Sequence, residues 1–310
     1  MKALVTGGAG FIGSNLVDAL LARGDAVSVV DDLSTGRREN LEGALVAGAE
    51  LAELDIRDAA ALAELVASAQ PEIVFHLAAQ IDVRKSLADP AFDASINVGG
   101  TANLLEAMRA AGSPRLVFVS TGGAIYGEGD GKQLPLGENA PIEPFSAYGQ
   151  SKFAAEGYLA LYERLYDLSG VSLRLGNVYG PRQDPLGEAG VIAIFCGRLR
   201  GGGRPTVFGD GTQTRDYIYV GDVVAAAIAA AGSEASGPIN IGSGIETDVL
   251  TLAWQLAEID GNESFEPEFA PPRAGEVQRI ALDAGRAERE LGWRAMTSVT
   301  DGLKLTLDSL

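Results

Sequence analysis

The segment TGGAGFIG at residues 6–13 constrains the fold of this chain more than any other feature of the sequence. It follows an apolar run at residues 2–6 and opens a helical pattern at residues 11–21, which is the setting that a dinucleotide-binding turn requires. Glycines let the turn close tightly and let the backbone approach a pyrophosphate, which the N–H groups at the helix N-terminus attract. The predicted cofactor contacts in this segment are Gly7, Gly10, Phe11, Ile12 and Gly13.

Strand-like and helical patterns alternate through the first half of the chain. Because parallel strands need crossover helices between them, this alternation predicts an α/β fold with a Rossmann-like, doubly wound parallel sheet. After about Gly176, Pro- and Gly-rich stretches predict a smaller, loop-rich C-terminal region packed against the sheet. We expect a dinucleotide-binding domain at 1–175, with a return segment near 216–232, and a substrate domain at 176–310. The strand-like runs are 2–6, 26–30, 72–77, 115–120 and 171–175, and the long helical patterns are 94–111 and 148–168.

Acidic residues at strand ends predict which dinucleotide binds. Asp31 ends the second apolar run, where a carboxylate can accept hydrogen bonds from the adenosine ribose and repel a 2′-phosphate. This favours NAD over NADP, although Arg37 and Arg38, which read as loop charges, leave an opening for NADP. Asp55 closes another strand, in LAELDIRD, at a position that suits either the adenine or a cap for the next helix. The predicted contacts at this end of the cofactor are Asp31, Asp32, Asp55 and Ile56.

Tyr148 and Lys152 in YGQSK lie four residues apart, so a phenol and an ammonium share one helix face. An unperturbed phenol titrates near ~10, and lowering its pKa to about 7 requires roughly 4 kcal/mol. One positive charge at about 4 Å supplies roughly that much at an effective dielectric near ~20. The pair alone also fits an ordinary solvated helix edge. Together with the glycine-rich turn, it predicts a tyrosine base whose pKa the lysine lowers.

Composition excludes several classes of function. A net charge of −18 opposes nucleic-acid binding, because phosphates would be repelled. The single cysteine, Cys196, excludes an internal disulfide, and the single histidine, His76, leaves little for zinc, so we expect no metal. Within IVFHLAA, His76 reads as a buried, hydrogen-bonded residue rather than a catalytic one. No apolar run approaches the ~20 residues that span a bilayer, so we expect no membrane partner and a cytoplasmic location.

Several motifs carry a resemblance to a known family, and they run nearly from end to end of the chain. They are GGAGFIGS, HLAAQIDVRKS, STGGAIYGE, SAYGQSK, NVYGPRQDPLGEAGVIAIF, VFGDGTQTRDYIYVGDV, NIGSG and PPRAGE. With them the chain resembles the extended short-chain dehydrogenase/reductase family and looks most like its UDP-glucose 4-epimerases. The resemblance implies an enzyme that holds NAD and acts on a UDP-sugar.

The resemblance assigns roles to the catalytic residues. It implies that Tyr148 removes a proton from a sugar hydroxyl, that Lys152 lowers the pKa of Tyr148 and contacts the nicotinamide ribose, and that Thr121 holds the same hydroxyl. Ser120 can share the role of Thr121, and Asn97 helps to position the site from a facing helix. The further cofactor contacts that it implies are Leu77, Ala78, Ala79, Asn97 and Ser120.

The resemblance also places a UDP-sugar site in the second half of the chain. Arginine forks suit diphosphate oxygens, so two of them would converge on about two negative charges. For any single arginine the alternative is a surface ion pair. The implied substrate contacts are Thr121, Tyr148, Asn177, Arg182, Phe208, Arg215 and Arg273.

Gly122 and Gly123 follow Thr121 where related 4,6-dehydratases carry an acid pair, so the sequence disfavours dehydration. UDP-glucuronate decarboxylases tend to carry a glutamate there and are disfavoured too. Two departures limit the resemblance. Ile81 stands where some epimerases have a lysine, so a phosphate contact is absent or comes from Arg84, and an aliphatic near Ile280 leaves the choice of N-acetylated sugars undecided.

The implied reaction is reversible C4 epimerisation between UDP-galactose and UDP-glucose through a 4-keto intermediate, with tightly bound NAD. The alternatives are epimerisation of UDP-glucuronate or UDP-N-acetylglucosamine, and a non-catalytic NAD-sensing protein. The resemblance further implies a homodimer that pairs through the helices near 94–111 and 148–168, with NAD in the first domain and the nucleotide sugar in the second.

Overall fold

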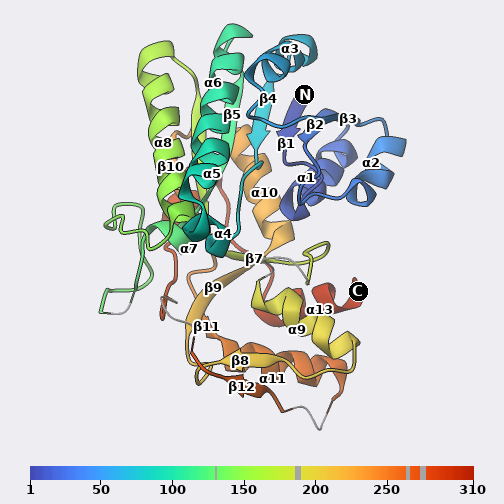
Figure 1. Cartoon of the computed structure of the whole chain (residues 1–310), viewed down its shortest axis with the longest axis vertical. Coiled ribbons are helices and arrows are strands. Elements are labelled where there is room, and N and C mark those ends of the chain that lie inside the picture. Colours follow the sequence, from blue (N-terminus) through green and yellow to red (C-terminus); the bar gives the residue numbers. More distant parts are fainter. Residues whose placement is uncertain (130, 186–189, 263–265, 273–276) are drawn as a thin grey trace.

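The computed structural model describes residues 1–129, 131–185, 190–262, 266–272 and 277–310. Its larger part is a seven-stranded sheet in the order β10-β6-β5-β4-β1-β2-β3, in which every neighbouring pair is parallel (Figure 1). The predicted α/β fold with a doubly wound parallel sheet is therefore confirmed. The strands are β1 (Lys2–Thr6), β2 (Ala26–Asp31), β3 (Glu50–Glu53), β4 (Ile73–His76), β5 (Arg115–Thr121), β6 (Gly170–Leu175) and β10 (Gly237–Ile241).

Helices cover both faces of this sheet, so its strands are apolar on both sides (Figure 1). Alternation along β1 illustrates the two layers, because Val5 packs into one core and Leu4 into the other. The first core includes residues of α1 (Phe11–Ala22), α10 (Val220–Ala231) and α12 (Gly285–Leu291). The second includes residues of α3 (Ala59–Ala69), α6 (Thr101–Ala110) and α8 (Ala147–Tyr166).

The chain returns to the large sheet after forming part of the second region. Strand β9 (Thr214–Tyr219) lies outside the large sheet, α10 then packs against α1 and β5, and β10 pairs in parallel with β6. The returning segment thus reaches Ile241, beyond the stretch near 216–232 that the sequence indicates. The five residues of β10 carry a weak signal, because Gly237 and Pro238 begin the strand.

A smaller region lies next to the carboxyl end of the sheet and has an apolar core of its own (Figure 1). It contains a three-stranded sheet in the order β11-β9-β7, in which β9 pairs antiparallel with β11 and parallel with β7. It also contains a parallel two-stranded sheet of β12 and β8. Cys196 is buried in this core, free of any disulfide. Its elements are β7 (Asn177–Tyr179), α9 (Val191–Arg200), β8 (Thr206–Phe208), β9, β11 (Glu246–Asp248), α11 (Val249–Asp260), β12 (Glu268–Ala270) and α13 (Val299–Asp308).

Short helices complete the chain, several of them close to the carboxyl end of the large sheet, where ligands of such folds bind. One is a π-helical turn, a form that is frequent at functional sites. Among the described residues, no helix combines the length and the apolar character needed to cross a membrane. The short elements are the 3₁₀ helix Arg38–Leu41, α2 (Glu42–Val46), α4 (Val83–Ala88), α5 (Pro90–Ala94), the π-helix Ser95–Gly100 and α7 (Gly122–Ile125).

Candidate functional site

The glycine-rich turn between β1 and α1 has no room for side chains. Gly7 has φ +71°, and a Cβ there would lie 2.6 Å from the backbone nitrogen of Ala78. A Cβ on Gly13 would lie 2.1 Å from the carbonyl oxygen of Gly7. Gly10 is the N-cap of α1 and offers no side-chain acceptor to the N–H groups of the first helical turn. The close backbone approach and these N–H groups fit a dinucleotide pyrophosphate, with the half-buried Phe11 and Ile12 beside it.

The carboxylate of Asp31, at the end of β2, reaches back to this turn. Its Oδ2 accepts a hydrogen bond from the Ala9 N–H and its Oδ1 accepts one from the Leu33 N–H, both at 2.9 Å. Burial raises the pKa of Asp31, while these two N–H groups act in the opposite direction. Asp31 therefore fixes the glycine turn and also stands where the sequence places a ribose contact.

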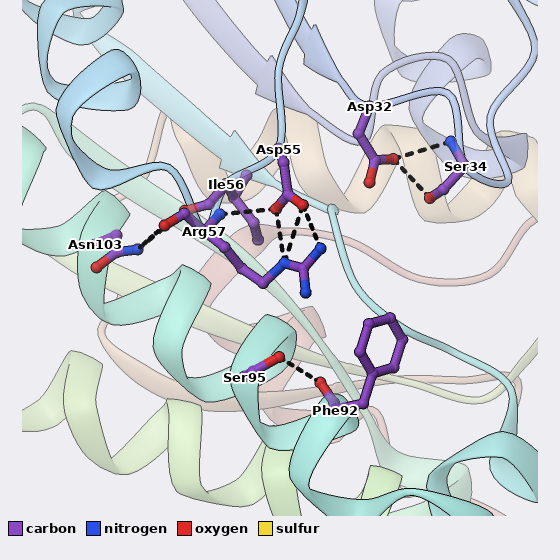
Figure 2. A network of polar contacts seen from close by, with 8 residues as sticks. All are labelled: Asp32, Ser34, Asp55, Ile56, Arg57, Phe92, Ser95 and Asn103. Carbon is purple, nitrogen blue, oxygen red and sulfur yellow. Dashed lines mark hydrogen bonds and ion pairs between the residues drawn. The ribbon is translucent and has the colours of Figure 1, made fainter.

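The predicted adenine end of the site lies where β2 and β3 end (Figure 2). Arg57 folds back on Asp55, with its Nε 2.9 Å and its Nη2 2.5 Å from Oδ2, and this hydrogen bonding lowers the pKa of Asp55. The cap of α3 is Asp58, which accepts a hydrogen bond from the Ala61 N–H, so Asp55 does not serve as that cap. The cap is therefore excluded, and a contact between Asp55 and the adenine stays a prediction for a carboxylate that Arg57 already engages.

Neighbouring contacts in Figure 2 hold the backbone at this edge in place. Asp32 accepts hydrogen bonds from the Ser34 N–H and hydroxyl, at 3.0 and 2.6 Å. The carbonyl of Ile56 accepts a hydrogen bond from the Asn103 amide at 3.1 Å, which ties the segment after β3 to α6.

Asn97 lies in the π-helical turn and is 2% exposed. Its Oδ1 accepts a hydrogen bond from the Gln80 N–H, and its Nδ2 donates to the Gln80 carbonyl, both at 2.9 Å. The same Nδ2 lies 3.0 Å from Ser151 Oγ, on α8. Asn97 thus links the half-buried segment Leu77, Ala78 and Ala79 to the helix that carries Tyr148, a positioning role.

Tyr148 lies in the first turn of α8, whose N-cap Ser146 accepts a hydrogen bond from the Gly149 N–H at 3.0 Å. The phenol is hydrogen bonded to the side chain of Thr121, at the end of β5. Burial raises the pKa of Tyr148 to about 12, Thr121 acts to lower it, and the charge of Asp93 raises it further. The expectation that Lys152 lowers this pKa is not met, because Lys152 is not among the groups that shift it.

The surroundings of Lys152 give the reason. Its side chain is 3% exposed, and Nζ lies 4.5 Å from the centroid of the Phe118 ring. Burial lowers the pKa of Lys152 to about 8, and the charges of Glu156 and Asp93 oppose that effect. The ammonium therefore lies over an aromatic ring, and the charges of two carboxylates act on it in addition to any interaction with the phenol.

Ser120 differs from Thr121, its neighbour on β5, because successive side chains of a strand point to opposite faces. The Ser120 hydroxyl donates to Glu156 Oε1 at 2.5 Å. Glu156 also receives Arg174, whose Nη2 lies 2.7 Å from Oε2, in a buried ion pair. The Ser120 hydroxyl is thus part of the buried Glu156–Arg174 network and lies on the other face of β5 from Thr121. The prediction that Ser120 shares the role of Thr121 is not supported by the structure.

The two glycines after Thr121 are closely surrounded. A Cβ on Gly123 would lie 3.3 Å from Asn177 Oδ1 and 3.9 Å from Thr121 Oγ1. A Cβ on Gly122 would lie 2.5 Å from a methyl carbon of Leu282. Gly123 thus lies between the side chains of Asn177, at the start of β7, and Thr121, whose hydroxyl is predicted to be catalytic.

The predicted arginines of the substrate site differ from one another. Arg182 Nη2 donates to Asp18 Oδ2 of α1 at 2.6 Å, so this side chain makes the ion pair that was the alternative to substrate binding. Arg215 lies on β9, where its Nη1 donates to the Thr214 carbonyl at 2.8 Å. Phe208 is half-buried at the end of β8, and Arg273 lies outside the described residues.

Other positions that the sequence singled out are placed as follows. Arg37 is ion-paired with Asp184, which accounts for it as a loop charge. Ile81 is 52% exposed, whereas Ile280 is 1% exposed and packs in a small core beside Leu282, so Ile280 offers no open wall to a sugar.

His76 is a buried histidine, as its sequence context indicates. Its Nδ1 lies 2.6 Å from Thr6 Oγ1 and its Nε2 lies 2.9 Å from Thr101 Oγ1. Burial, followed by the charge of Lys152, lowers the pKa of His76 to about 3, so the imidazole is neutral at physiological pH.

Sequence reasoning missed four residues behind the site, which are the buried Asp93, Glu156 and Arg174 and the half-buried Gln80. Glu156 carried a usable signal, because it follows Lys152 by the same four residues that separate Lys152 from Tyr148. Asp93 precedes Asn97 by four residues as well, but its hydrogen bond from Gln80 joins residues 13 positions apart and leaves no local pattern.

A glycine-turn site at the carboxyl end of a parallel sheet, joined to a buried lysine and to a half-buried tyrosine and threonine that are hydrogen bonded to each other, defines the class of short-chain dehydrogenase/reductase-like proteins. A family model described as the NAD dependent epimerase/dehydratase family matches residues 3–242, and the chain belongs to this family. The cofactor predicted from Asp31 and the glycine turn, NAD, is therefore confirmed at the level of the family.

Known relatives are similar over nearly the whole chain. The UDP-glucose 4-epimerase of Mycolicibacterium smegmatis is 47% identical over 310 residues, which cover 99% of this chain and 98% of that protein. A crystal structure of the Thermotoga maritima UDP-glucose 4-epimerase with UDP-glucose has a TM-score of 0.95 and 45% identity, covering 100% of this chain and 98% of the other. The Thermus thermophilus UDP-glucose 4-epimerase in complex with NAD has a TM-score of 0.91 and 43% identity, with the same coverage.

Proposed function

We propose that this chain is a UDP-hexose 4-epimerase that interconverts UDP-galactose and UDP-glucose through a 4-keto intermediate. The observation that carries the proposal is the hydrogen-bonded pair Tyr148 and Thr121, bordered by Gly122 and Gly123 and faced by Asn177. The pair can exchange a proton with a sugar hydroxyl, and the glycines supply no acid that would eliminate water. The three relatives described above, which are UDP-glucose 4-epimerases with 43–47% identity, add support.

The residues would divide the work as follows. Tyr148 takes the proton of the C4 hydroxyl and later returns it to the same oxygen, while Thr121 holds that oxygen by a hydrogen bond. NAD, when bound, supplies the hydride acceptor and donor for C4. Lys152 adds positive charge beneath the site and holds the cofactor ribose. Because the pKa of Tyr148 stands at about 12 in the protein alone, the phenol needs further positive charge before it becomes an effective base.

Epimerisation needs a firm hold on UDP and a loose hold on the hexose, because the keto sugar must present its other face. We assign the hold on UDP to Asn177, Phe208, Arg215 and Arg273, all in the proposed nucleotide-sugar domain at 176–310. The NAD-binding domain is the proposed unit at 1–175 with its return segment. Gly122 and Gly123 place no side chain beside Thr121, so neither position presents a group that would hold the hexose in one orientation.

The test is conversion of UDP-galactose by the purified protein, followed by NMR of the anomeric protons. We expect UDP-glucose to accumulate to an equilibrium that is the same from either sugar. UDP-glucuronate and UDP-N-acetylglucosamine are run in parallel, because the alternatives predict that one of them is preferred. No interconversion of any UDP-hexose, despite bound NAD, would sink the epimerase proposal and favour the sensing alternative.

We further infer that the enzyme is a homodimer in the cytoplasm. Support for the dimer comes from the outer surface of α8, where Phe153, Tyr158, Leu165 and Tyr166 are 37% to 60% exposed. Aromatic and aliphatic side chains of this kind are typical of a helix that packs against a partner. Light scattering decides between one and two copies, and cell fractionation tests the location.

A further inference from the structure

Asp93 is a fully buried carboxylate that the proposed reaction does not use. It lies in α5 and is 0% exposed. Its Oδ1 accepts hydrogen bonds from Gln80 Nε2 at 3.0 Å and Asn97 Nδ2 at 3.2 Å. Its Oδ2 has no hydrogen-bond partner among the described residues. An ionised carboxylate in such a place is costly unless a positive charge lies near it.

The nearby positive charge is Lys152. Helix α5 packs against α8, and the charge of Asp93 acts on both Lys152 and Tyr148. The other carboxylate near Lys152 is Glu156, which is already neutralised by Arg174 and hydrogen bonded by Ser120. On β4, His76 faces Lys152 as a neutral ring.

Asp93 thus differs from Glu156, because among the described residues its carboxylate accepts side-chain hydrogen bonds only from the neutral amides of Gln80 and Asn97. The side chain is completely buried, and its Oδ2 accepts no hydrogen bond from any described residue. A merely structural carboxylate of this chain looks different. Asp216, for example, is equally buried but accepts hydrogen bonds from Ser243, Gly244 and Leu282.

We propose that Asp93 is a positioning residue whose unpaired negative charge keeps the Lys152 ammonium and the Tyr148 phenol protonated. It acts through Lys152 and Tyr148 and touches no substrate. The inference rests on the proposed function, since it concerns the same proton-transfer pair. In consequence the phenol holds its proton until the positive charge of the oxidised cofactor opposes Asp93, so that proton removal is confined to the complex that can also accept hydride.

The direct test is an NMR titration of Lys152 with ¹³C-labelled lysine. The chain has only five lysines, Lys2, Lys85, Lys132, Lys152 and Lys304, so assignment by substitution is simple. Asp93→Asn keeps the size of the side chain and removes its charge. We expect the titration midpoint of Lys152 to fall by roughly one pH unit.

The matched control is Asp25→Asn. Asp25 is also a buried carboxylate whose Oδ2 accepts no hydrogen bond within the described part of the chain, but it is ion-paired with the N-terminal ammonium and with Arg23, far from Lys152 in the sequence. We expect this variant to leave the midpoint of Lys152 unchanged. An unchanged midpoint in folded Asp93→Asn protein would overturn the proposal. If circular dichroism shows that Asp93→Asn unfolds, Asp93→Ser, which leaves space for water, makes the same measurement.

The second readout is the pH profile of kcat with UDP-galactose. Removing the charge of Asp93 lets both Tyr148 and Lys152 lose their protons at lower pH. Both limbs of the profile should therefore move to lower pH by roughly one unit, with KM little changed. A loss of activity with an unmoved profile would indicate a structural role and contradict the proposal. If the wild-type protein converts no UDP-hexose, the proposed function fails, and the Lys152 titration still decides the role of Asp93.

Discussion

The cofactor side of the site is made of backbone, whereas the substrate side is made of long side chains. On the cofactor side, a Cβ on Gly13 would meet the Gly7 carbonyl at 2.1 Å, and Asp31 bonds the turn directly. On the proposed substrate side, the Arg215 side chain donates to the carbonyl of its neighbour Thr214, while Arg182 is held by Asp18. A backbone site is fixed before its ligand arrives, while side chains rearrange at small cost. The contrast fits an enzyme that retains NAD and lets its sugar turn.

The largest expected effect on turnover comes from Tyr148, which lies between the proposed cofactor side and the proposed substrate side of the site. Tyr148→Phe removes the proton-transferring oxygen and should lower kcat by roughly 10³-fold, with UDP and NAD binding kept. Steady-state kinetics and calorimetry measure the two quantities. Near-normal turnover would refute Tyr148 as the base.

The next effect tests the rigidity of the backbone side. Gly13→Ala forces a Cβ against backbone that cannot give way, so we expect loss of bound NAD and a destabilisation of roughly 1–3 kcal/mol. Gly43→Ala is the control, because a Cβ there has open space and should stabilise α2 by up to about 1 kcal/mol. NAD released on denaturation and the midpoint of thermal unfolding are the readouts. Full NAD content in Gly13→Ala would contradict the contrast.

A smaller effect is expected on the side-chain side of the site. Arg215→Ala should raise KM for UDP-galactose by about 10- to 100-fold, the range for a lost hydrogen bond to a charged group. The change in kcat should be much smaller, because the diphosphate lies away from the reacting carbon. An unchanged KM would remove Arg215 from the substrate site.

The smallest effect is expected at Arg182. Its ion pair with Asp18 is partly exposed to solvent, so Arg182→Ala should change KM by no more than about 3-fold. Stability should fall by less than about 1 kcal/mol, measured by denaturant titration. A rise in KM as large as that of Arg215→Ala would restore Arg182 as a substrate contact.

The same contrast explains which features the sequence could predict. The glycine turn, the parallel strands and the Tyr148–Lys152 spacing are local patterns, and the structure has all three. Pairings between distant segments leave no local pattern. Arg182 contacts Asp18 across 164 positions of sequence, and each residue of the short β10 pairs with a residue of β6 that lies 66 positions earlier, as in Gly237 and Val171.

Electrostatics inside the site was the least predictable part. The spacing of Tyr148 and Lys152 correctly indicates a shared helix, but burial dominates both pKa values, which stand at about 12 and about 8. Burial and the placement of Asp93 depend on how α5, α8 and the sheet pack together. The helical spacing therefore identifies the two groups but does not predict the pKa of either one.

The most direct test of the central claim is the fate of a label on C4. UDP-galactose deuterated at C4 is incubated with the purified protein in ordinary water, without added NAD, and the product is analysed by mass spectrometry and NMR. A hydride that leaves and returns to the opposite face of the same keto sugar predicts UDP-glucose with the deuterium still on C4. Product that has lost its deuterium to solvent, or no product at all, would contradict the account.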